Sequence, residues 1–230
     1  MGKTIISQAR GHGGPRYQVR KQAFIYRVRY PLFEGSARVL RIIHSAAHSA
    51  PLIKVQAGTH TFYNVAFEGA VEGQEFVLGN EINVGNVVAL KQIPAGTAVY
   101  NIERNPGDGG KMIRAAGTNA FINKHYEHDK VGVIMPNKHE VIVDGSCRAT
   151  VGVVAGDGRQ QKPFITAGRK FFKMQAKGKL WPRTSAVKMN AIDHPFGSGR
   201  GKRIKSKIAK RNAPAGARVG HIRPRRTGRH

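Results

Sequence analysis

The run Arg38-Val39-Leu40-Arg41-Ile42-Ile43 is the first of several strand-like segments in the chain. It is rich in β-branched and apolar residues and lies between turn-forming residues, a pattern typical of a short β-strand. Similar runs recur about every ten residues, a spacing typical of small all-β domains. The further members of this group cover residues 52–55, 62–67, 75–78 and 86–90. Five short strands within about fifty residues favour an OB-type barrel.

A second group of strand-like runs follows residues 91–96, where Pro94 and Gly96 mark a break in the pattern. These runs cover residues 97–102, 111–115, 120–124, 131–135, 140–144 and 149–154. They predict a second small barrel. We therefore predict a mainly β protein organised as a basic N-terminal arm (1–30), an OB-fold barrel (31–90), a second barrel (91–160) and a basic, glycine-rich C-terminal extension (161–230).

The chain has 230 residues and a net charge of +26, and this charge is concentrated at its two ends. Residues 1–30 hold seven basic side chains and no acidic ones, residues 31–160 hold twelve of each, and residues 161–230 hold twenty basic against one acidic. Blocks of like charge repel unless a partner neutralises them. Nucleic acid is the favoured partner, because phosphate contacts by Lys and Arg release counterions. An anionic membrane is disfavoured, because the basic tail has no amphipathic stripe of large apolar residues.

Cysteine usage and hydropathy indicate the compartment. Cys147 is the single cysteine, so an internal disulfide framework is excluded and a reducing environment is favoured. The first residues lack the apolar run of a signal peptide, and no window approaches the length of a membrane span. We expect a cytoplasmic protein.

The stretch Met189-Asn190-Ala191-Ile192-Asp193-His194-Pro195-Phe196-Gly197-Ser198-Gly199-Arg200-Gly201 is predicted to be an irregular loop. Its three glycines and one proline disfavour a helix or a strand. Lys202-Arg203-Ile204-Lys205-Ser206-Lys207 follows directly, so we expect a polyanion to hold the loop. Residues 203–211 are expected to form one short basic helix whose partner is phosphate.

The sequence contains several partial enzyme and metal signatures, and each lacks a residue that the signature requires. Residues 105–112 resemble a phosphate-binding loop, but Asn stands at the first glycine position and no Ser or Thr follows the lysine, so a glycine-rich turn is favoured. His44 and His48 have the spacing of zinc ligands on a helix, yet they lack the glutamate between them and lie beside strand-like sequence. His125 and His128 also lack a third ligand at a telling distance, so solvated loop histidines are favoured.

Asp193 and His194 are the one adjacent pair with some catalytic appeal, because an aspartate can orient an imidazole. In a cationic, glycine-rich loop, His194 is more simply a hydrogen-bond donor to a phosphate or a base. Cys147 lies in a strand-like run, where a buried thiol is expected. We predict no catalytic residue, no metal site and no cofactor. A hydrolase using the pair and a promiscuous nucleic-acid chaperone remain the alternatives.

Five runs, in order along the chain, resemble one protein family. Residues 190–197 (Asn-Ala-Ile-Asp-His-Pro-Phe-Gly) are similar to a signature of the second protein of the large ribosomal subunit, the L-two family. Residues 94–103, 114–118, 147–152 and 212–216 resemble further runs of that family. Phe196 and the tail Arg225-Arg226-Thr227-Gly228-Arg229 are similar to its archaeal and eukaryotic branch, and the short length suggests an archaeon.

The resemblance implies an OB-fold RNA-binding domain at residues 31–90, followed by an SH3-like barrel at 91–160 and a C-terminal extension at 161–230. It also implies a primary binder of large-subunit ribosomal RNA that supports assembly, subunit association, tRNA binding and the peptidyl-transferase region, close to His194. RNA carries that reaction, so the resemblance implies no enzyme. Residues 197–203 depart from the family pattern, because cations stand where histidines are usual. A catalytic histidine after the glycines is therefore in doubt.

The candidate RNA-binding residues are cations, hydrogen-bonding side chains, and glycines that let the backbone approach RNA closely. In the arm they are Arg10, His12, Arg16, Arg20, Lys21, Arg27 and Arg29. In the extension they are Arg169, Lys170, Arg183, Lys188, Asn190, His194, Gly197, Gly199, Arg200, Gly201, Lys202, Arg203, Arg225 and Arg226. The expected partners are large-subunit ribosomal RNA and other large-subunit proteins, near tRNA and the small subunit. Specificity is expected to come from RNA shape, because the major groove of A-form RNA is too narrow to read.

Overall fold

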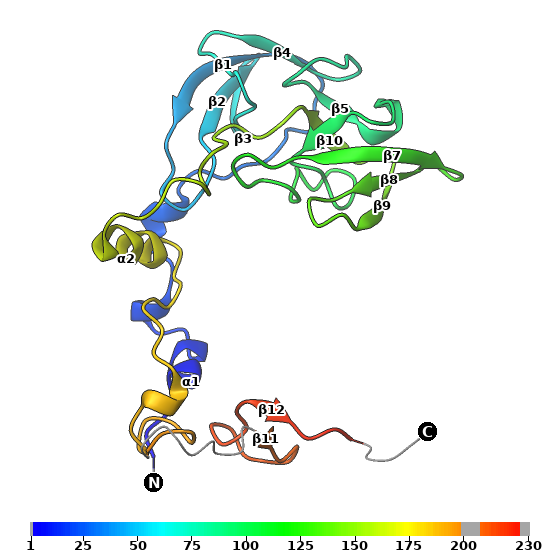
Figure 1. Cartoon of the computed structure of the whole chain (residues 1–230). Helices are drawn as coiled ribbons and strands as arrows, with labels where there is room; N and C mark the ends of the chain where they lie inside the picture. The colour runs from blue at the N-terminus through cyan, green and yellow to red at the C-terminus, as the bar shows by residue number, and fades with distance from the viewer. Residues whose placement is uncertain (1, 199–207, 226–230) are drawn as a thin grey trace. The chain divides into compact units, whose positions relative to one another are not determined.

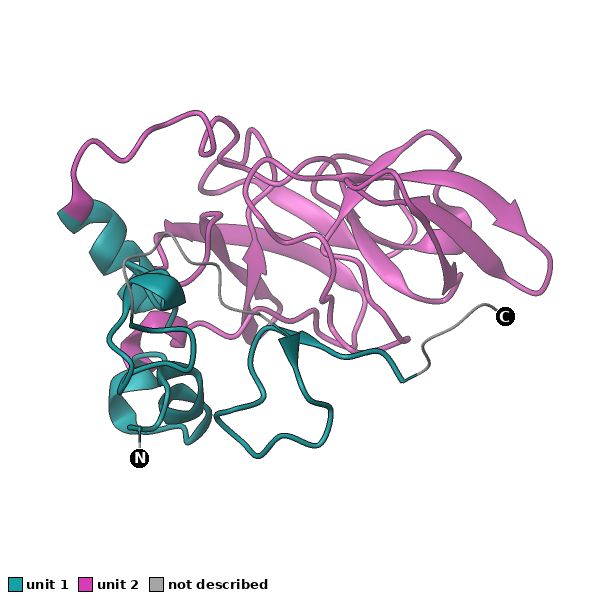
Figure 2. Cartoon of the chain, turned by 60° about the horizontal axis from the view of Figure 1, so that its bottom comes forward, with its two compact units in different colours: residues 1–20, 168–230 teal, residues 21–167 magenta. Residues whose placement is uncertain are grey.

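A computed structural model describes residues 2–198 and 208–225. The chain divides into two compact units. Unit 2 is one continuous segment, residues 21–167, whereas unit 1 combines residues 1–20 with residues 168–230 (Figure 2). Unit 1 therefore joins the two cationic ends of the sequence.

Unit 2 is built on a ten-stranded sheet (Figure 1). Its strands are β1 (Gly35–Ile43), β2 (Leu52–Ala57), β3 (His60–Val65), β4 (Glu75–Leu78), β5 (Val87–Ala89), β6 (Ala98–Tyr100), β7 (Ala120–Tyr126), β8 (Lys130–Ile134), β9 (Glu140–Asp144) and β10 (Arg148–Val151). Their order across the sheet is β3-β2-β1-β4-β5-β10-β6-β7-β8-β9. All neighbours are antiparallel except β4 and β5, which pair in parallel at Leu78 and Val87. Two short 3₁₀ turns, Lys21–Phe24 and Leu90–Gln92, complete the elements of this unit.

Two hydrophobic clusters stabilise unit 2, because alternate strand residues face inward. In β1, Ala37 and Val39 are buried while Arg38 between them is exposed. The first cluster draws mainly on residues 28–78 and the second on residues 88–151. Strand β5 serves both, with Val87 in the first cluster and Val88 in the second. The expectation of a mainly β protein is confirmed, and two adjacent cores agree with an OB-fold followed by an SH3-like barrel.

One predicted strand is wrong. Residues 111–115 contribute only an isolated bridge, between Met112 and Ile102. The N–H groups of Lys111 and Met112 both donate to the carbonyl oxygen of Ile102, at 2.9 and 3.0 Å. Ile113 then adopts a φ of +54°, in the left-handed region that an extended strand does not contain. The glycine-rich turn before it therefore leads into an irregular segment.

Unit 1 contains short elements and few buried residues. It holds α1 (Ile6–Gly11), the 3₁₀ turns Pro15–Tyr17 and Ala186–Lys188, α2 (Ala167–Ala176, which begins at the unit boundary), β11 (Ile208–Ala209) and β12 (His221–Ile222). Within its described part, the buried residues are Ile5, Gly197 and Ala209. A unit with so little apolar burial gains little stability from a hydrophobic core.

The cationic ends hold secondary structure that the sequence did not predict. Residues 6–11 of the arm form α1. The prediction of a basic helix at 203–211 is wrong for residues 208 and 209. These two residues form β11, which pairs in parallel with β12. Residues 203–207 lie outside the described part of the chain. Helix α2 was not predicted, because its sequence AGRKFFKMQA is cationic and places two phenylalanines side by side, although Thr166 before it is a residue favoured at helix N-caps.

Candidate nucleic-acid interface

The structure brings most of the predicted RNA-binding residues into unit 1. Of the arm residues, Arg10, His12, Arg16 and Arg20 belong to unit 1, whereas Lys21, Arg27 and Arg29 belong to unit 2. From the extension, Arg169, Lys170, Arg183, Lys188, Asn190, His194, Gly197 and Arg225 are described in unit 1. Gly199, Arg200, Gly201, Lys202, Arg203 and Arg226 lie outside the described residues.

Arg10 connects the arm to the extension inside unit 1. Its guanidinium donates to the carbonyl oxygen of Gly178 at 2.7 Å and lies 5.6 Å from the ring centroid of Tyr17. In the extension itself, the ammonium of Lys170 lies 5.2 Å from the Trp181 ring centroid. These cations are held in place by neighbours that carry no negative charge, so their charge stays available to an anion.

The loop at residues 189–198 closes on itself through backbone hydrogen bonds. The N–H groups of Asp193 and His194 donate to the carbonyl oxygen of Asn190 at 3.1 and 3.3 Å. The N–H of Ser198 returns to the carbonyl oxygen of Met189 at 3.0 Å. The loop is irregular, as predicted, yet its described part is a folded turn before any partner binds.

Gly197 is required by the loop itself. A Cβ at this position would lie 2.2 Å from the carbonyl oxygen of Asn190, which real structures do not tolerate. From the sequence, we expect this glycine to allow a close approach of RNA. The structure supplies a reason within the chain, because the backbone of residues 189 and 190 fills the space.

Replacing Gly197 by alanine should open this turn. We expect the amide of Ser198, which closes the loop, to exchange at least about tenfold faster with deuterium, the equivalent of about 1.4 kcal/mol of local opening. Gly11→Ala is the matched control, because no atom lies within 4 Å of a Cβ at that position. Equal exchange in the two variants would contradict this role of Gly197.

His194 is oriented by its own loop. Its Nδ1 accepts the N–H of Phe196 at 3.0 Å, and the two rings lie 5.0 Å apart between centroids. With Nδ1 acting as an acceptor, the neutral imidazole carries its hydrogen on Nε2. His194 therefore offers one N–H donor, which suits a phosphate oxygen or a base acceptor.

Asp193 has a different role from the one that a catalytic pair requires. Its carboxylate forms an ion pair with the ammonium of Lys3 at 3.5 Å, and the N–H of Lys3 donates to the carbonyl oxygen of Ile192 at 2.8 Å. The hydrogen bond that fixes the imidazole of His194 comes from Phe196 instead. The carboxylate thus ties the arm to the loop, and the arrangement does not support a hydrolase based on this pair.

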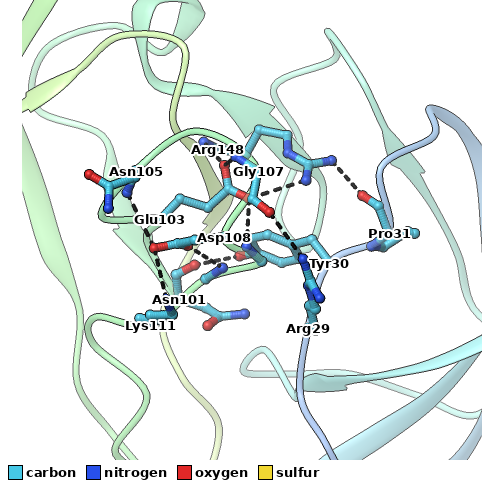
Figure 3. A network of polar contacts seen from close by, with 12 residues as sticks. Arg29, Tyr30, Pro31, Asn101, Glu103, Asn105, Gly107, Asp108, Lys111 and Arg148 are labelled. Carbon is cyan, nitrogen blue, oxygen red and sulfur yellow. Dashed lines mark hydrogen bonds and ion pairs between the residues drawn. The ribbon is translucent and has the colours of Figure 1, made fainter.

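Residues 105–112, which resemble a phosphate-binding loop, form a turn around the carboxylate of Asp108 (Figure 3). The carboxylate of Asp108 accepts the N–H groups of Arg104, Asn105 and Gly110 at 3.1 to 3.2 Å. Partial burial raises the pKa of this carboxyl, but these donors and the ammonium of Lys111 outweigh it, so the pKa lies below its usual value. Because the chain's own carboxylate occupies these amides, they do not form a phosphate site.

The buried carboxylate of Glu103 organises the other side of this turn (Figure 3). It is fully buried and accepts the N–H of Gly109 at 3.0 Å and of Gly107 at 3.3 Å. It also accepts the backbone N–H of Arg148 at 2.9 Å and its guanidinium at 3.1 Å. Arg148 in turn donates to the carbonyl oxygen of Pro31 at 2.7 Å. One ion pair therefore joins three segments that are distant in sequence.

Arg29 also contacts the turn at residues 105–110, through one hydrogen bond. Its guanidinium donates to the carbonyl oxygen of Gly107 at 3.4 Å, which is a long hydrogen bond, and the residue remains exposed. The neighbouring Tyr30 is fully buried, and this burial raises the pKa of its hydroxyl far above the usual value. Its hydroxyl donates to the carbonyl oxygen of Asn101 at 2.8 Å.

His48 and Cys147 have structural roles. His48 Nδ1 lies 2.8 Å from the hydroxyl of Ser45, and burial lowers the pKa of this histidine. Burial likewise raises the pKa of the Cys147 thiol to about 12, as expected for an inert core cysteine. Across residues 2–198 and 208–225, no three His, Cys, Asp or Glu side chains gather as metal ligands would. In the same ranges, no helix is both long and apolar enough to cross a membrane.

One surface was missed by the sequence analysis. Basic and aromatic side chains line a hollow of about 460 Å³ on unit 2: Tyr26, Arg41, Ile42, Ile43, His44, Lys54 and Tyr63. The exposed basic residues on β1 and β2 were a signal, but only the strand pairing shows that they meet. Unit 2 thus carries a cationic, aromatic surface, although residues 31–160, which form most of this unit, hold equal numbers of basic and acidic side chains.

Comparison with known proteins identifies the family. The profile described as "Ribosomal Proteins L2, C-terminal domain" matches residues 83–216. The chain is 45% identical to the large ribosomal subunit protein uL2 of Archaeoglobus fulgidus over 99% of both chains. It is 42% identical to uL2 of Korarchaeum cryptofilum, covering 100% of this chain and 96% of that one. It is also 43% identical to uL2 of Methanococcus maripaludis strain C5 over the full length of both.

The chain belongs to the L2 family of ribosomal proteins. It is a structural constituent of the large ribosomal subunit, not an enzyme, and it resides in the ribosome in the cytoplasm. The archaeal relatives confirm the archaeal type that the tail and the loop suggested.

Proposed function

We propose that this protein is a primary binder of large-subunit ribosomal RNA, with unit 1 as its main RNA-binding part. The observation that carries the proposal is the union of both cationic ends in one unit with few buried residues. Such a unit gains its stability from phosphates, because its own apolar burial is small. Unit 2 supplies a rigid β framework.

The residues proposed to contact RNA are those of the arm and the extension. In the described part of the chain they are Arg10, His12, Arg16, Arg20, Lys21, Arg27, Arg29, Arg169, Lys170, Arg183, Lys188, Asn190, His194, Gly197 and Arg225. The domain boundaries at residues 30, 90 and 160 belong to the same proposal. By family resemblance, the protein supports subunit assembly and association, tRNA binding and the geometry of the peptidyl-transferase region.

Reconstitution of the large subunit tests this proposal. Large-subunit particles are assembled from RNA and proteins with the labelled full-length chain and then washed at high salt. We expect the chain to sediment with the particle, because many phosphate contacts act together. A chain that stays at the top of the gradient, with particles that form equally well without it, would contradict the proposal.

Replacing His194 by alanine should impair assembly or peptide-bond formation only modestly. The change removes the Nε2 donor and the turn contact with Phe196, but the closing hydrogen bonds of the loop are made by backbone atoms. We expect a loss of about tenfold or less, the value of a single hydrogen bond. The measurement is peptide-bond formation on fully assembled subunits. A loss of many orders of magnitude would mean that His194 takes part in the reaction.

A further inference from the structure

Three adjacent strands of unit 2 place two cations and an aromatic ring in one row. Arg41 of β1 pairs with Lys54 of β2, and Lys54 pairs with Tyr63 of β3. Residues directly opposite each other in antiparallel strands project from the same face of the sheet. We call these three residues the β1–β3 row. A guanidinium, an ammonium and a phenol ring therefore stand side by side on one face of the sheet, across the adjacent strands β1, β2 and β3.

A second aromatic ring completes the surface. The rings of Tyr26 and Tyr63 lie 5.0 Å apart between centroids, with an angle of 56° between their planes. An isolated parallel bridge between Val28 and Tyr63 holds this N-terminal segment beside β3. Together with His44, these groups line the hollow of about 460 Å³. Its volume lies within the range typical of ligand pockets, roughly 300 to 1,000 Å³.

The two cations of the row lack a negative partner. The ion pairs of unit 2, within its described residues, are Lys111 with Asp108 and Arg148 with Glu103. Like charges directly opposite each other destabilise an antiparallel pair. The carboxylate of Glu72 is held by the N–H of Ile42 at 2.8 Å and forms no ion pair with Arg41. The sheet thus carries a local repulsion that an anion between the two side chains would relieve.

We propose that this hollow binds one unpaired nucleotide of RNA. The phosphate lies between Arg41 and Lys54, and the base stacks on the rings of Tyr63 and Tyr26. His44 at the rim supplies a further hydrogen-bonding group. This inference rests on the proposed RNA-binding function and adds a site on unit 2, outside the two cationic ends.

The aromatic rings distinguish RNA from an acidic protein segment. Base stacking on an aromatic side chain contributes roughly 1 to 3 kcal/mol and needs a flat ring beside a cationic groove, as found here. A carboxylate-rich peptide would use the cations and leave the rings without a partner. The base must be unpaired, because a paired base does not expose its face.

The first arm of the test is stability without RNA. Arg41→Gln in the full-length chain should raise the denaturation midpoint of unit 2, because it removes the repulsion with Lys54. The gain should shrink as salt is added, because counterions screen exposed charges. Arg159→Gln, which removes an exposed arginine elsewhere on unit 2, should leave the midpoint unchanged. A lower midpoint for Arg41→Gln would contradict the proposed repulsion.

The second arm is crosslinking by ultraviolet light. The full-length chain is irradiated with large-subunit ribosomal RNA fragments, and the linked peptides are mapped by mass spectrometry. We expect links at Tyr26 or Tyr63, and a yield at least about tenfold lower in the Arg41→Gln/Lys54→Gln double variant, as for the loss of charge-assisted hydrogen bonds. Arg159→Gln should keep the wild-type yield. Overall affinity is a poorer readout, because the cationic ends dominate it.

Absence of links at both tyrosines, or an equal yield in the double variant, would overturn the inference. So would links from these tyrosines to an acidic neighbouring protein in reconstituted subunits with none to RNA. If the wild-type chain binds ribosomal RNA selectively while the tyrosines stay unlinked, only this site is wrong. If the wild-type chain shows no selective RNA binding, the proposed function itself is wrong.

Discussion

Glu103→Gln is expected to lower the free energy of unfolding of unit 2 by about 3 to 5 kcal/mol, the usual cost of removing one partner of a buried ion pair. The change leaves the guanidinium of Arg148 without its counter-charge, although that side chain is only 16% exposed. It also turns an NH₂ group toward amides that donate hydrogen bonds, because a glutamine accepts through only one of its two terminal atoms. The turn at residues 105–110 and the hydrogen bond from Arg148 to the carbonyl oxygen of Pro31 should weaken together.

Chemical denaturation followed by far-ultraviolet circular dichroism measures this loss, since unit 2 holds most of the strands. The matched control is Glu127→Gln, which changes an exposed acid without a hydrogen bond or ion pair to any described residue, and it should change the unfolding free energy by less than about 0.5 kcal/mol. An Arg148→Met variant and the double variant complete a cycle that isolates the pair. A loss in Glu103→Gln no larger than that of the control would contradict the role of this ion pair.

Removal of residues 161–230 is expected to leave a folded β unit that binds RNA poorly. All residues of the two hydrophobic clusters and their packed neighbours lie between positions 26 and 155, so the cores remain intact. The deletion removes twenty basic side chains and one acidic one. We expect RNA affinity to fall by about three orders of magnitude or more, because the salt-dependent phosphate contacts supply most of the binding.

The slope of log affinity against log salt concentration is the sharper readout of this deletion. Each lost phosphate contact should reduce its magnitude by about 0.7 to 0.9. Removal of residues 1–20, which deletes four basic side chains, should reduce the slope much less. Wild-type affinity and slope in the variant that lacks 161–230 would show that the extension is not the main RNA-binding part.

Much of the fold could be predicted from the sequence, because strand formation in unit 2 follows local patterns. Nearly all strands fall on runs of alternating or apolar residues bounded by turns. The failures have local causes that a pattern does not reveal. Ile113 is β-branched and favours a strand, yet it adopts a left-handed backbone in an irregular segment. Helix α2 follows Thr166, a residue favoured at helix N-caps, but its charged, aromatic composition does not indicate a helix.

The candidate site was predictable in part. The concentration of cations at both ends is visible in the sequence, but their union in one unit depends on contacts such as Arg10 with Gly178, which are 168 residues apart. The β1–β3 row depends on strand register, and the register of β1 and β2 shifts between Val39 and Arg41. A shift of one residue moves a side chain to the other face of a sheet. The meeting of Arg41 and Lys54 therefore needed the structure.

The most direct test of the account is the binding of the purified full-length chain to large-subunit ribosomal RNA fragments, compared with an unrelated structured RNA, from low to high salt. The account predicts a steep salt dependence together with a preference for the ribosomal fragments that persists at high salt, because shape and ordered contacts add to charge. Equal binding to both RNAs that disappears as salt rises would contradict it and would describe a general polycation.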